Sequence, residues 1–227
     1  MKSFITRLGL VLGLLTTGLT GFAADTRTNY LKWENDIATF EHADATNPPP
    51  KGAVLFAGSS TIRLWQSLAQ DLPNLAVINR GFGGSWLEDS THFADRIIFP
   101  YAPSKIVLRA GGNDLASGKS PEQVFADYQE FVAVVHAKLP EAEIIFISWA
   151  PTIARWNQVE KEKTLNKLVA NYAKAHPKLG YIETSDLVLG ADGKPRAELF
   201  RADKTHFNDA GYRLLAERVR AYFATVK

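Results

Sequence analysis

The stretch that decides the fold is residues 53–61, AVLFAGSST. A short apolar run from Ala53 to Ala57 ends in a glycine and two serines, and an amphipathic segment, Thr61 to Leu72, follows at once. This order predicts a buried strand, a tight turn and a helix. In an open α/β sheet, ligands bind at the carboxyl ends of the strands, where such a turn lies. The stretch therefore predicts a nucleophilic serine or a serine that only caps the helix.

Further apolar runs alternate with helical patterns along the rest of the chain. The expected strands after the first are 75–78, 105–108, 144–147 and 179–182. The expected helices are 27–43, 61–72, 86–99, 120–139, a segment around 165–172, and 208–223. Short apolar strands that alternate with helices predict a parallel sheet covered on both faces. Since no linker divides the pattern, we expect a single α/β domain.

Composition and charge exclude several classes of protein. The 227 residues are 46% hydrophobic and 22% charged, which is typical of a globular domain with a sizeable core. The 26 basic and 24 acidic residues give a formal net charge of +2, and no basic stripe indicates nucleic acid. The chain has no cysteine, so neither disulfides nor a lipoprotein anchor is expected.

The first residues resemble an export signal. Lys2 and Arg7 precede an apolar segment, residues 8–22, and small residues follow before Ala24. This pattern predicts a signal peptide over residues 1–23 that is cleaved near Ala23 or Ala24, and hence a periplasmic or secreted protein. The apolar segment is short and interrupted by glycines and threonines, so we expect no stable membrane anchor. Residues 24–50 are then an N-terminal helical extension, and residues 51–227 the main domain.

Polar, glycine-rich segments follow three of the expected strands. They are residues 58–60, 81–84 and 111–114, and a fourth polar segment, residues 203–206, precedes the last helix. Because the carboxyl ends of parallel strands meet at one edge of a sheet, we expect the first three segments to lie close together.

The residue types in these segments suit acyl transfer. The hydroxyl of Ser60 needs a base within hydrogen-bond reach, and His206 can serve as that base. Asp203 can accept the other ring N–H and stabilise the imidazolium that forms. The backbone N–H groups of Ser60 and Gly84 and the side-chain amide of Asn113 can form an oxyanion hole.

With these residues, the chain resembles the SGNH hydrolases, also called GDSL-type esterases and lipases. The resemblance extends from about Ala53 to Phe223 and consists of four blocks in order: AGSST with Ser60, RGFGGS with Gly84, GGND with Asn113, and DKTH with Asp203 and His206. It implies a flavodoxin-like three-layer α/β/α sandwich with a five-stranded parallel sheet. It also implies ester hydrolysis through a Ser-His-Asp triad, with no cofactor and no metal.

One position departs from the family pattern. The first block usually reads Gly-Asp-Ser, and here Ser59 replaces the aspartate. Two adjacent serines make the choice of nucleophile less automatic. We assign it to Ser60, which occupies the family position and immediately precedes the expected helix.

The sequence predicts an exported serine ester hydrolase whose substrate is a small-molecule or glycan ester with a short acyl or acetyl group. The alternatives are an acyltransferase, a lysophospholipase or thioesterase, and a glycan-binding protein without catalytic activity. Trp86 and Trp149 could line a substrate subsite, although packing explains both equally well. Arg80 and Arg155 could bind a polar group of the substrate, but we expect them to be solvated loop residues.

Overall fold

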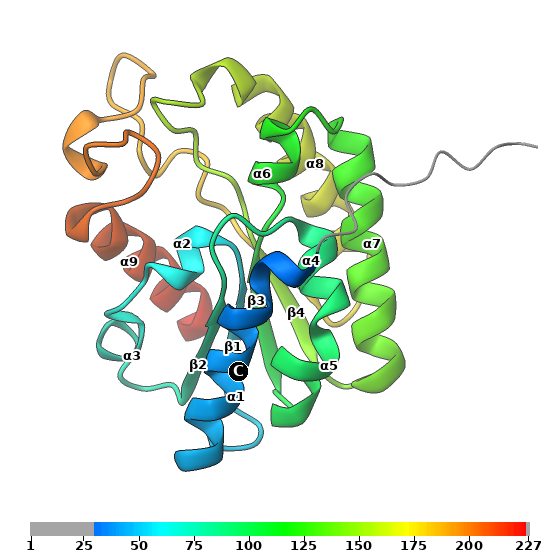
Figure 1. Cartoon of the computed structure of the whole chain (residues 1–227). Helices are drawn as coiled ribbons and strands as arrows, with labels where there is room; N and C mark the ends of the chain where they lie inside the picture. Colours follow the sequence, from blue (N-terminus) through cyan, green and yellow to red (C-terminus); the bar gives the residue numbers. More distant parts are fainter. Residues whose placement is uncertain (1–29, 226–227) are drawn as a thin grey trace, which may run out of the picture.

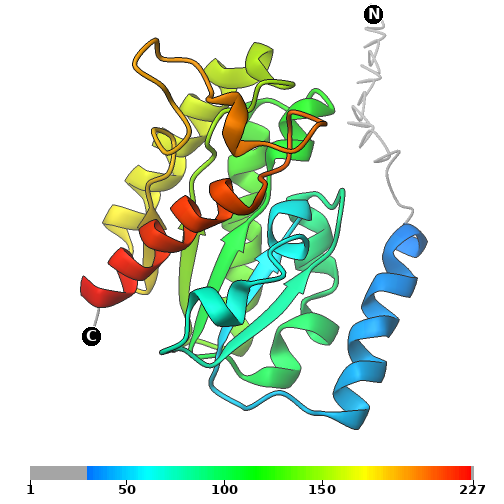
Figure 2. The same ribbon diagram turned by 90° about the vertical axis from the view of Figure 1, so that its left-hand side faces the viewer.

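Five parallel strands form the centre of the computed structural model, which describes residues 30–225 (Figures 1 and 2). They are β1 (Val54–Gly58), β2 (Val77–Gly81), β3 (Lys105–Arg109), β4 (Glu143–Ile147) and β5 (Leu179–Ile182). Their order across the sheet is β2-β1-β3-β4-β5, and every neighbouring pair is parallel. This is the flavodoxin-like order, so the expected three-layer α/β/α sandwich is confirmed.

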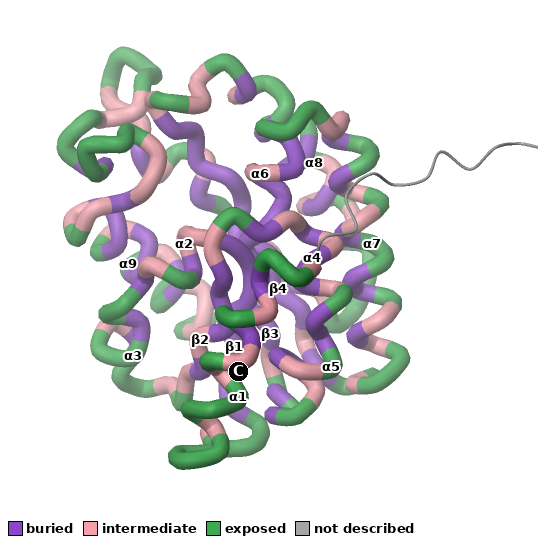
Figure 3. Tube along the Cα trace, in the orientation of Figure 1, coloured by how far each residue is buried: buried purple, intermediate pink, exposed green. Residues whose placement is uncertain are grey.

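Both faces of the sheet are buried, which is why its strands are apolar runs. Successive side chains of a strand point to opposite faces. In β1, Leu55 and Ala57 pack into the core on one face, whereas Val54 and Phe56 pack into the core on the other. Figure 3 shows the result, with buried strands inside and exposed surfaces on the outer sides of the helices.

The helices form the two outer layers. On one face, buried residues come from α1 (Glu34–Thr46), α4 (Leu87–His92), α5 (Ala94–Ile97), α7 (Pro121–Lys138) and α8 (Val159–Ala175). On the other face they come from α2 (Ser60–Arg63), α3 (Leu68–Asp71) and α9 (Asp209–Thr225). A short helix, α6 (Gly112–Ala116), follows β3, and 3₁₀ turns occur at Tyr30–Trp33, Phe99–Tyr101, Trp156–Gln158 and Ala197–Leu199.

Helix α7 begins with a capping box at Ser120. The hydroxyl of Ser120 accepts a hydrogen bond from the backbone N–H of Gln123, at 3.2 Å. The side chain of Gln123 in turn accepts from the backbone N–H of Ser120, at 2.8 Å. Two N–H groups that have no partner within a helix are thereby satisfied, and α7 begins where the sequence indicates.

The prediction of one helix over residues 61–72 is wrong, because the chain forms α2 and α3 with an irregular stretch between them. Within that stretch, Trp65 is fully buried, with its ring 5.8 Å from that of Phe56. The indole of Trp65 and the hydroxyl of Ser67 both donate to the carboxylate of Asp71, each at 2.7 Å. These bonds tie the irregular stretch to the end of α3.

Two other boundaries also differ from the prediction. The expected helix over residues 86–99 is interrupted at Phe93, which separates α4 from α5. The second strand begins and ends later than expected, because β2 pairs with β1 as far as Gly81. The polar residue Asn79 is accommodated at this edge strand by a 2.7 Å bond from its side chain to the carbonyl of Ile62.

Arg80 is buried, so its expected placement in a solvated loop is wrong. Only 7% of the residue is exposed, and its guanidinium pairs with Asp44 of α1 at 2.5 Å. It also donates to the hydroxyl of Tyr101 at 2.9 Å. These bonds attach the N-terminal helix to the sheet.

The first described residues pack against a loop at the carboxyl end of the sheet. Trp33 and Ile37 are buried, and the indole N–H of Trp33 donates to the carbonyl of Gly83 at 2.9 Å. The predicted signal peptide lies outside the described residues. Within residues 30–225, no helix has the length and apolar character needed to cross a membrane.

Candidate active site

The turn between β1 and α2 places Ser60 at the carboxyl end of the sheet. Gly58 has φ +126°, and a Cβ at this position would lie 2.1 Å from the carbonyl oxygen of Arg109. Ser59 occupies the cap position of α2, where its carbonyl accepts from the N–H of Ile62 at 3.0 Å. Ser60 is the first residue of the helix and not its cap, so its side chain is available for other contacts.

The side chains of Ser60, His206 and Asp203 form a continuous hydrogen-bonded chain. The hydroxyl Oγ of Ser60 is 3.0 Å from Nε2 of His206, and Nδ1 of His206 is 2.7 Å from Oδ2 of Asp203. Since an ionised carboxylate can only accept, Nδ1 carries the ring proton. Nε2 then accepts from the hydroxyl of Ser60, which is the arrangement that a general base requires.

Asp203 is held in its ionised form by the loop that carries His206. Its Oδ1 accepts from the backbone N–H groups of His206 and Thr205, each at 2.9 Å. Together with the ring of His206, these donors hold the pKa of Asp203 well below its usual range. The residues around them are fixed by a 2.8 Å bond between the N–H of Arg201 and the carbonyl of His206.

The loop that carries Gly84 and the helix α6, which carries Asn113, are joined to each other. The side-chain nitrogen of Asn113 donates to the carbonyl of Ser85 at 3.0 Å, and the N–H of Leu87 donates to the carboxyl of Asp114 at 3.1 Å. Gly84 is exposed and has φ +76°, a conformation that glycine adopts without strain. The structure thus brings the second and third sequence blocks to the same edge of the sheet.

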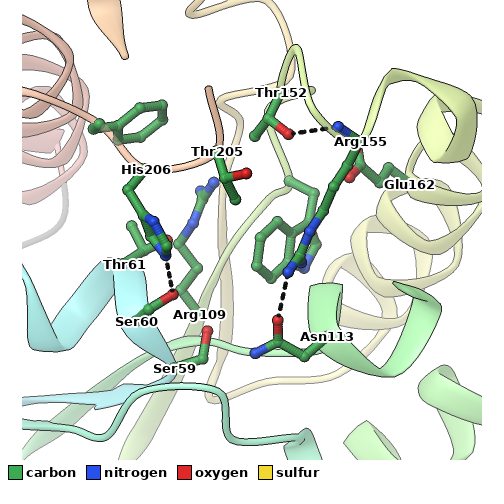
Figure 4. Close-up of a pocket in the computed structure, with 12 residues that line it drawn as sticks. Ser59, Ser60, Thr61, Arg109, Asn113, Thr152, Arg155, Glu162, Thr205 and His206 are labelled. Carbon is green, nitrogen blue, oxygen red and sulfur yellow. Dashed lines mark hydrogen bonds between the residues drawn. The ribbon is translucent and has the colours of Figure 1, made fainter. Parts of the chain in front are cut away.

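A cavity of about 20 Å³ lies between these segments (Figure 4). Ser60, His206 and Asn113 line it, together with residues from the loop after β4 and from α8. Four of the five expected site residues therefore lie in or directly behind one cavity, with Asp203 bonded to the far side of the imidazole. Gly84 adjoins Ser85, which holds the amide of Asn113.

The two tryptophans have different surroundings. Trp149 lines the cavity, but only 7% of it is exposed, and its indole N–H donates to the carbonyl of Ala110 at 2.9 Å. Its ring packs so closely on Gly112 that a Cβ there would lie 2.6 Å away. Trp86 precedes α4, with the ammonium of Lys119 at 5.1 Å from the ring centre.

Three charged residues of the cavity wall were not assigned to the site from the sequence. Arg109 is buried, donates to the carbonyl of Ser148 at 2.6 Å, and has its pKa lowered to about 10 by burial. Glu162 is 2% exposed, and burial raises its pKa. Arg155, expected to be solvated, is half-buried and bonded to Asn113. No pattern in the sequence indicates that these three charged residues, which lie on a strand, a helix and a loop, meet in the wall of one cavity.

No arrangement suited to a metal ion occurs among the described residues, in that no three or more His, Asp and Glu side chains are grouped to hold one. The polar groups that line the cavity are instead several hydroxyls, an imidazole, an amide, two guanidinium groups and one carboxylate. This set suits the binding of an oxygen anion and the transfer of a proton.

The sequence model of the GDSL-like lipase/acylhydrolase family matches residues 49–214. The chain belongs to this family. As a GDSL-like acylhydrolase it is a carboxylic ester hydrolase, as the sequence predicts. The matched region includes β1 to β5 and all four sequence blocks.

Solved structures share the fold at low sequence identity. A protein from Streptococcus pneumoniae, provisionally described as a platelet activating factor, is 21% identical with a TM-score of 0.74, over 85% of this chain and 94% of its own. A Bacteroides fragilis protein, provisionally described as an acylhydrolase, is 20% identical with a TM-score of 0.70, over 82% and 95%. A variant of an acetyl-xylooligosaccharide esterase from Geobacillus is 15% identical with a TM-score of 0.62, over 76% and 94%. Curated protein sequences give no match.

Proposed function

We propose that this GDSL-like acylhydrolase is an exported serine esterase that removes small acyl groups, including acetyl groups on carbohydrates, through Ser60, His206 and Asp203. The observation that carries the proposal is the hydrogen-bonded chain from the hydroxyl of Ser60 through the imidazole of His206 to the carboxylate of Asp203, with distances of 3.0 and 2.7 Å.

The first half of the reaction forms an acyl-enzyme. Ser60 Oγ attacks the ester carbonyl while Nε2 of His206 takes the hydroxyl proton. Asp203 remains ionised and stabilises the imidazolium through the N–H at Nδ1. When the tetrahedral intermediate collapses, the same proton passes from Nε2 to the leaving alcohol.

The negative oxygen of the intermediate needs donors that are in place beforehand. The backbone N–H of Ser60 is one of the first in α2, and such groups have no partner within their helix. The N–H of Gly84 and the side-chain amide of Asn113 complete the proposed oxyanion hole. Asn113 is half-buried, and its interaction with a developing charge is stronger there than it would be in bulk water.

The second half of the reaction releases the acyl group. A water molecule takes the place of the departed alcohol, His206 removes a proton from it, and the resulting hydroxide attacks the acyl carbon. The second tetrahedral intermediate then expels Ser60 Oγ, which recovers its proton from His206. These steps use only side chains of the protein and water.

The shape of the site supports a small acyl group. The cavity beside Ser60 holds about 20 Å³, little more than one water molecule occupies. A second hollow of about 160 Å³ shares Trp149 and Glu162 with the first and is also lined by Trp156. Aromatic rings with nearby polar groups suit a sugar, and one structural neighbour is an acetyl-xylooligosaccharide esterase.

Export is proposed from the sequence of residues 1–23, which has the basic start, apolar segment and small residues of a signal peptide. A membrane anchor and nucleic-acid binding form no part of the proposal. The mature chain is nearly neutral, because the segment removes two of the 26 basic residues and none of the acidic ones.

Two adjacent serines provide the test and its control. The mature protein is expected to hydrolyse p-nitrophenyl acetate faster than p-nitrophenyl octanoate, and Ser60→Ala to lower kcat by about 10³-fold or more. Ser59→Ala, which removes a hydroxyl from the same turn, is expected to retain most of the activity. If Ser59→Ala were inactive and Ser60→Ala active, the nucleophile would be misassigned.

A further inference from the structure

The side-chain amide of Asn113 is held at both ends. Its nitrogen donates to the carbonyl of Ser85 at 3.0 Å, and its oxygen accepts from Nη2 of Arg155, also at 3.0 Å. Turning the amide over would place its oxygen against the carbonyl of Ser85 and its NH₂ group against the guanidinium. Both contacts would be repulsive, so only one orientation is compatible with these neighbours.

That orientation leaves a donor for the reaction. The amide nitrogen carries two N–H groups, and the carbonyl of Ser85 accepts only one of them. Figure 4 shows the nitrogen of Asn113 on the side of Ser59 and Ser60, and the oxygen on the side of Arg155. The NH₂ group of Asn113, with its second N–H, therefore lies on the same side of the cavity as Ser60.

Arg155 acts on this amide through its charge as well as its position. A hydrogen bond from a cation is roughly twice as strong as one between neutral groups, and bonds in a chain polarise one another. Electron density drawn toward the oxygen of Asn113 makes the N–H groups of the same amide stronger donors. A guanidinium bonded to the amide oxygen therefore strengthens the remaining N–H of Asn113 as a donor.

The guanidinium is itself fixed by several bonds. Its Nη1 donates to the carbonyl of Gly112 at 3.2 Å, so the two terminal nitrogens contact adjacent residues of the third block. The backbone N–H of Arg155 donates to the hydroxyl of Thr152 at 3.3 Å. The preceding N–H, of Ala154, donates to the carbonyl of Lys204 at 3.0 Å, in the loop that carries His206.

A buried carboxylate lies near this arrangement. Glu162 lines the same cavity, accepts from the side chain of Gln158 at 2.9 Å, and interacts electrostatically with the cations Arg155 and Arg109. Its negative charge partly compensates the positive charge that Arg155 brings into the cavity wall. The guanidinium remains bonded to Gly112 and Asn113.

We infer that Arg155 is a positioning residue for the proposed ester hydrolysis, which fixes and polarises the amide of Asn113 as an oxyanion donor. The inference rests on the proposed function, because it assigns a role within the same reaction. The two terminal nitrogens of the planar guanidinium donate to the carbonyl of Gly112 and to the side-chain oxygen of Asn113 at the same time. The single ammonium nitrogen of a lysine cannot reproduce this forked arrangement.

The test is a double-mutant cycle on p-nitrophenyl acetate hydrolysis with Arg155→Ala, Asn113→Ala and both changes together. Arg155→Ala is expected to lower kcat by about 10- to 100-fold, the effect of one charge-assisted hydrogen bond, with KM changed by less than about threefold. Asn113→Ala is expected to lower kcat by about 10²- to 10³-fold. The double variant should be no worse than Asn113→Ala, since Arg155 acts only through that amide.

Two further variants complete the design. Arg155→Lys keeps the charge but not the fork, and is expected to recover only part of the lost kcat. Arg213→Ala removes an equal charge from an exposed position on α9 and is expected to leave kcat unchanged. If Arg155→Ala does not fold, Arg155→Lys and Arg155→Gln take its place in the same cycle.

The cycle separates this inference from the proposed function. If the loss from Arg155→Ala lay in KM and persisted undiminished in the Asn113→Ala background, Arg155 would bind substrate directly and the inference would be overturned. If the Ser60→Ala variant retained the activity of the wild-type protein, the proposed function would fail instead. A measurement that does not depend on catalysis is the ¹H–¹⁵N NMR signal of the side-chain NH₂ group of Asn113. This signal should be sharp in the wild-type protein and broadened in the Arg155→Ala variant. An unchanged resonance would also contradict the inference.

Discussion

Asp114 is a buried carboxyl next to the proposed oxyanion donor. The residue has no measurable exposure, one of its oxygens accepts from the N–H of Leu87, and the other has no partner within the described residues. Burial raises the pKa of Asp114 to about 7, although Lys119 opposes the shift. Asp114 thus links α6 to α4, and its contribution to the free energy of unfolding depends on pH.

The sign of that dependence follows from the direction of the shift. The pKa of an aspartate is ordinarily about 4. Below that pH, Asp114 is protonated in both the folded and the unfolded chain, and its contribution to the free energy of unfolding is at its most favourable. Between about pH 4 and pH 7 the carboxyl is ionised in the unfolded chain while burial keeps it protonated in the folded one, so the free energy of unfolding falls as pH rises toward 7. Asp114→Asn should therefore raise the free energy of unfolding by about 1–3 kcal/mol more at pH 8 than at pH 5.

Urea unfolding of both proteins at the two pH values measures this difference directly. Other titrating groups are common to the two proteins, so they cancel in the comparison. An equal effect of Asp114→Asn at pH 5 and pH 8 would mean that Asp114 ionises in the folded protein as an exposed aspartate does.

The residues of the triad could be proposed from the sequence because their blocks are short, ordered and specific in combination. The role of Arg155 could not, since its contact with Asn113 joins α6, which follows β3, to the loop after β4 and depends on the three-dimensional arrangement. The same is true of Glu162, whose burial in α8 has no signature in a pattern of charged residues.

At the scale of elements, the turn after β1 depends on Gly58. Its φ of +126° is one that other residues rarely adopt, and a Cβ would lie 2.1 Å from a backbone oxygen. Gly193 also has a positive φ, +71°, but a Cβ there would have nothing within 4 Å. Gly58→Ala should lower the free energy of unfolding by at least about 2 kcal/mol more than Gly193→Ala.

Thermal or urea unfolding of the two variants tests this prediction. Both variants place a side chain at a positive φ, and only Gly58→Ala also brings it against the carbonyl oxygen of Arg109 at the end of β3. Equal losses for Gly58→Ala and Gly193→Ala would show that the turn relaxes around the added methyl group.

The sequence predicts whether a segment is a helix or a strand more reliably than it predicts whether a helix continues without a break. Ile62, Trp65, Leu68 and Leu72 recur at helical spacing and are all buried, yet the segment is broken between α2 and α3. Periodicity reports which residues face the core, and two short helices can bury the same face as one long helix. The apolar pattern therefore does not reveal where the helix is interrupted.

At the scale of the whole molecule, strand order brings the site together. β1 lies between β2 and β3, so the loops that follow these three strands are neighbours at one edge of the sheet. The periodicity of the sequence indicates a parallel sheet but not this order, which came from the resemblance to the SGNH hydrolases. The loop before α9 then places His206 beside Ser60, although the two residues are 146 positions apart in the sequence.

The most direct test of this convergence is covalent labelling with a fluorophosphonate, which loses fluoride when an activated serine hydroxyl attacks its phosphorus. Peptide mass spectrometry should find a single adduct, on Ser60, in the wild-type protein, and His206→Ala should greatly slow its formation. An adduct on Ser59, or labelling of Ser60 that is equally fast without His206, would contradict the assignment of nucleophile and base.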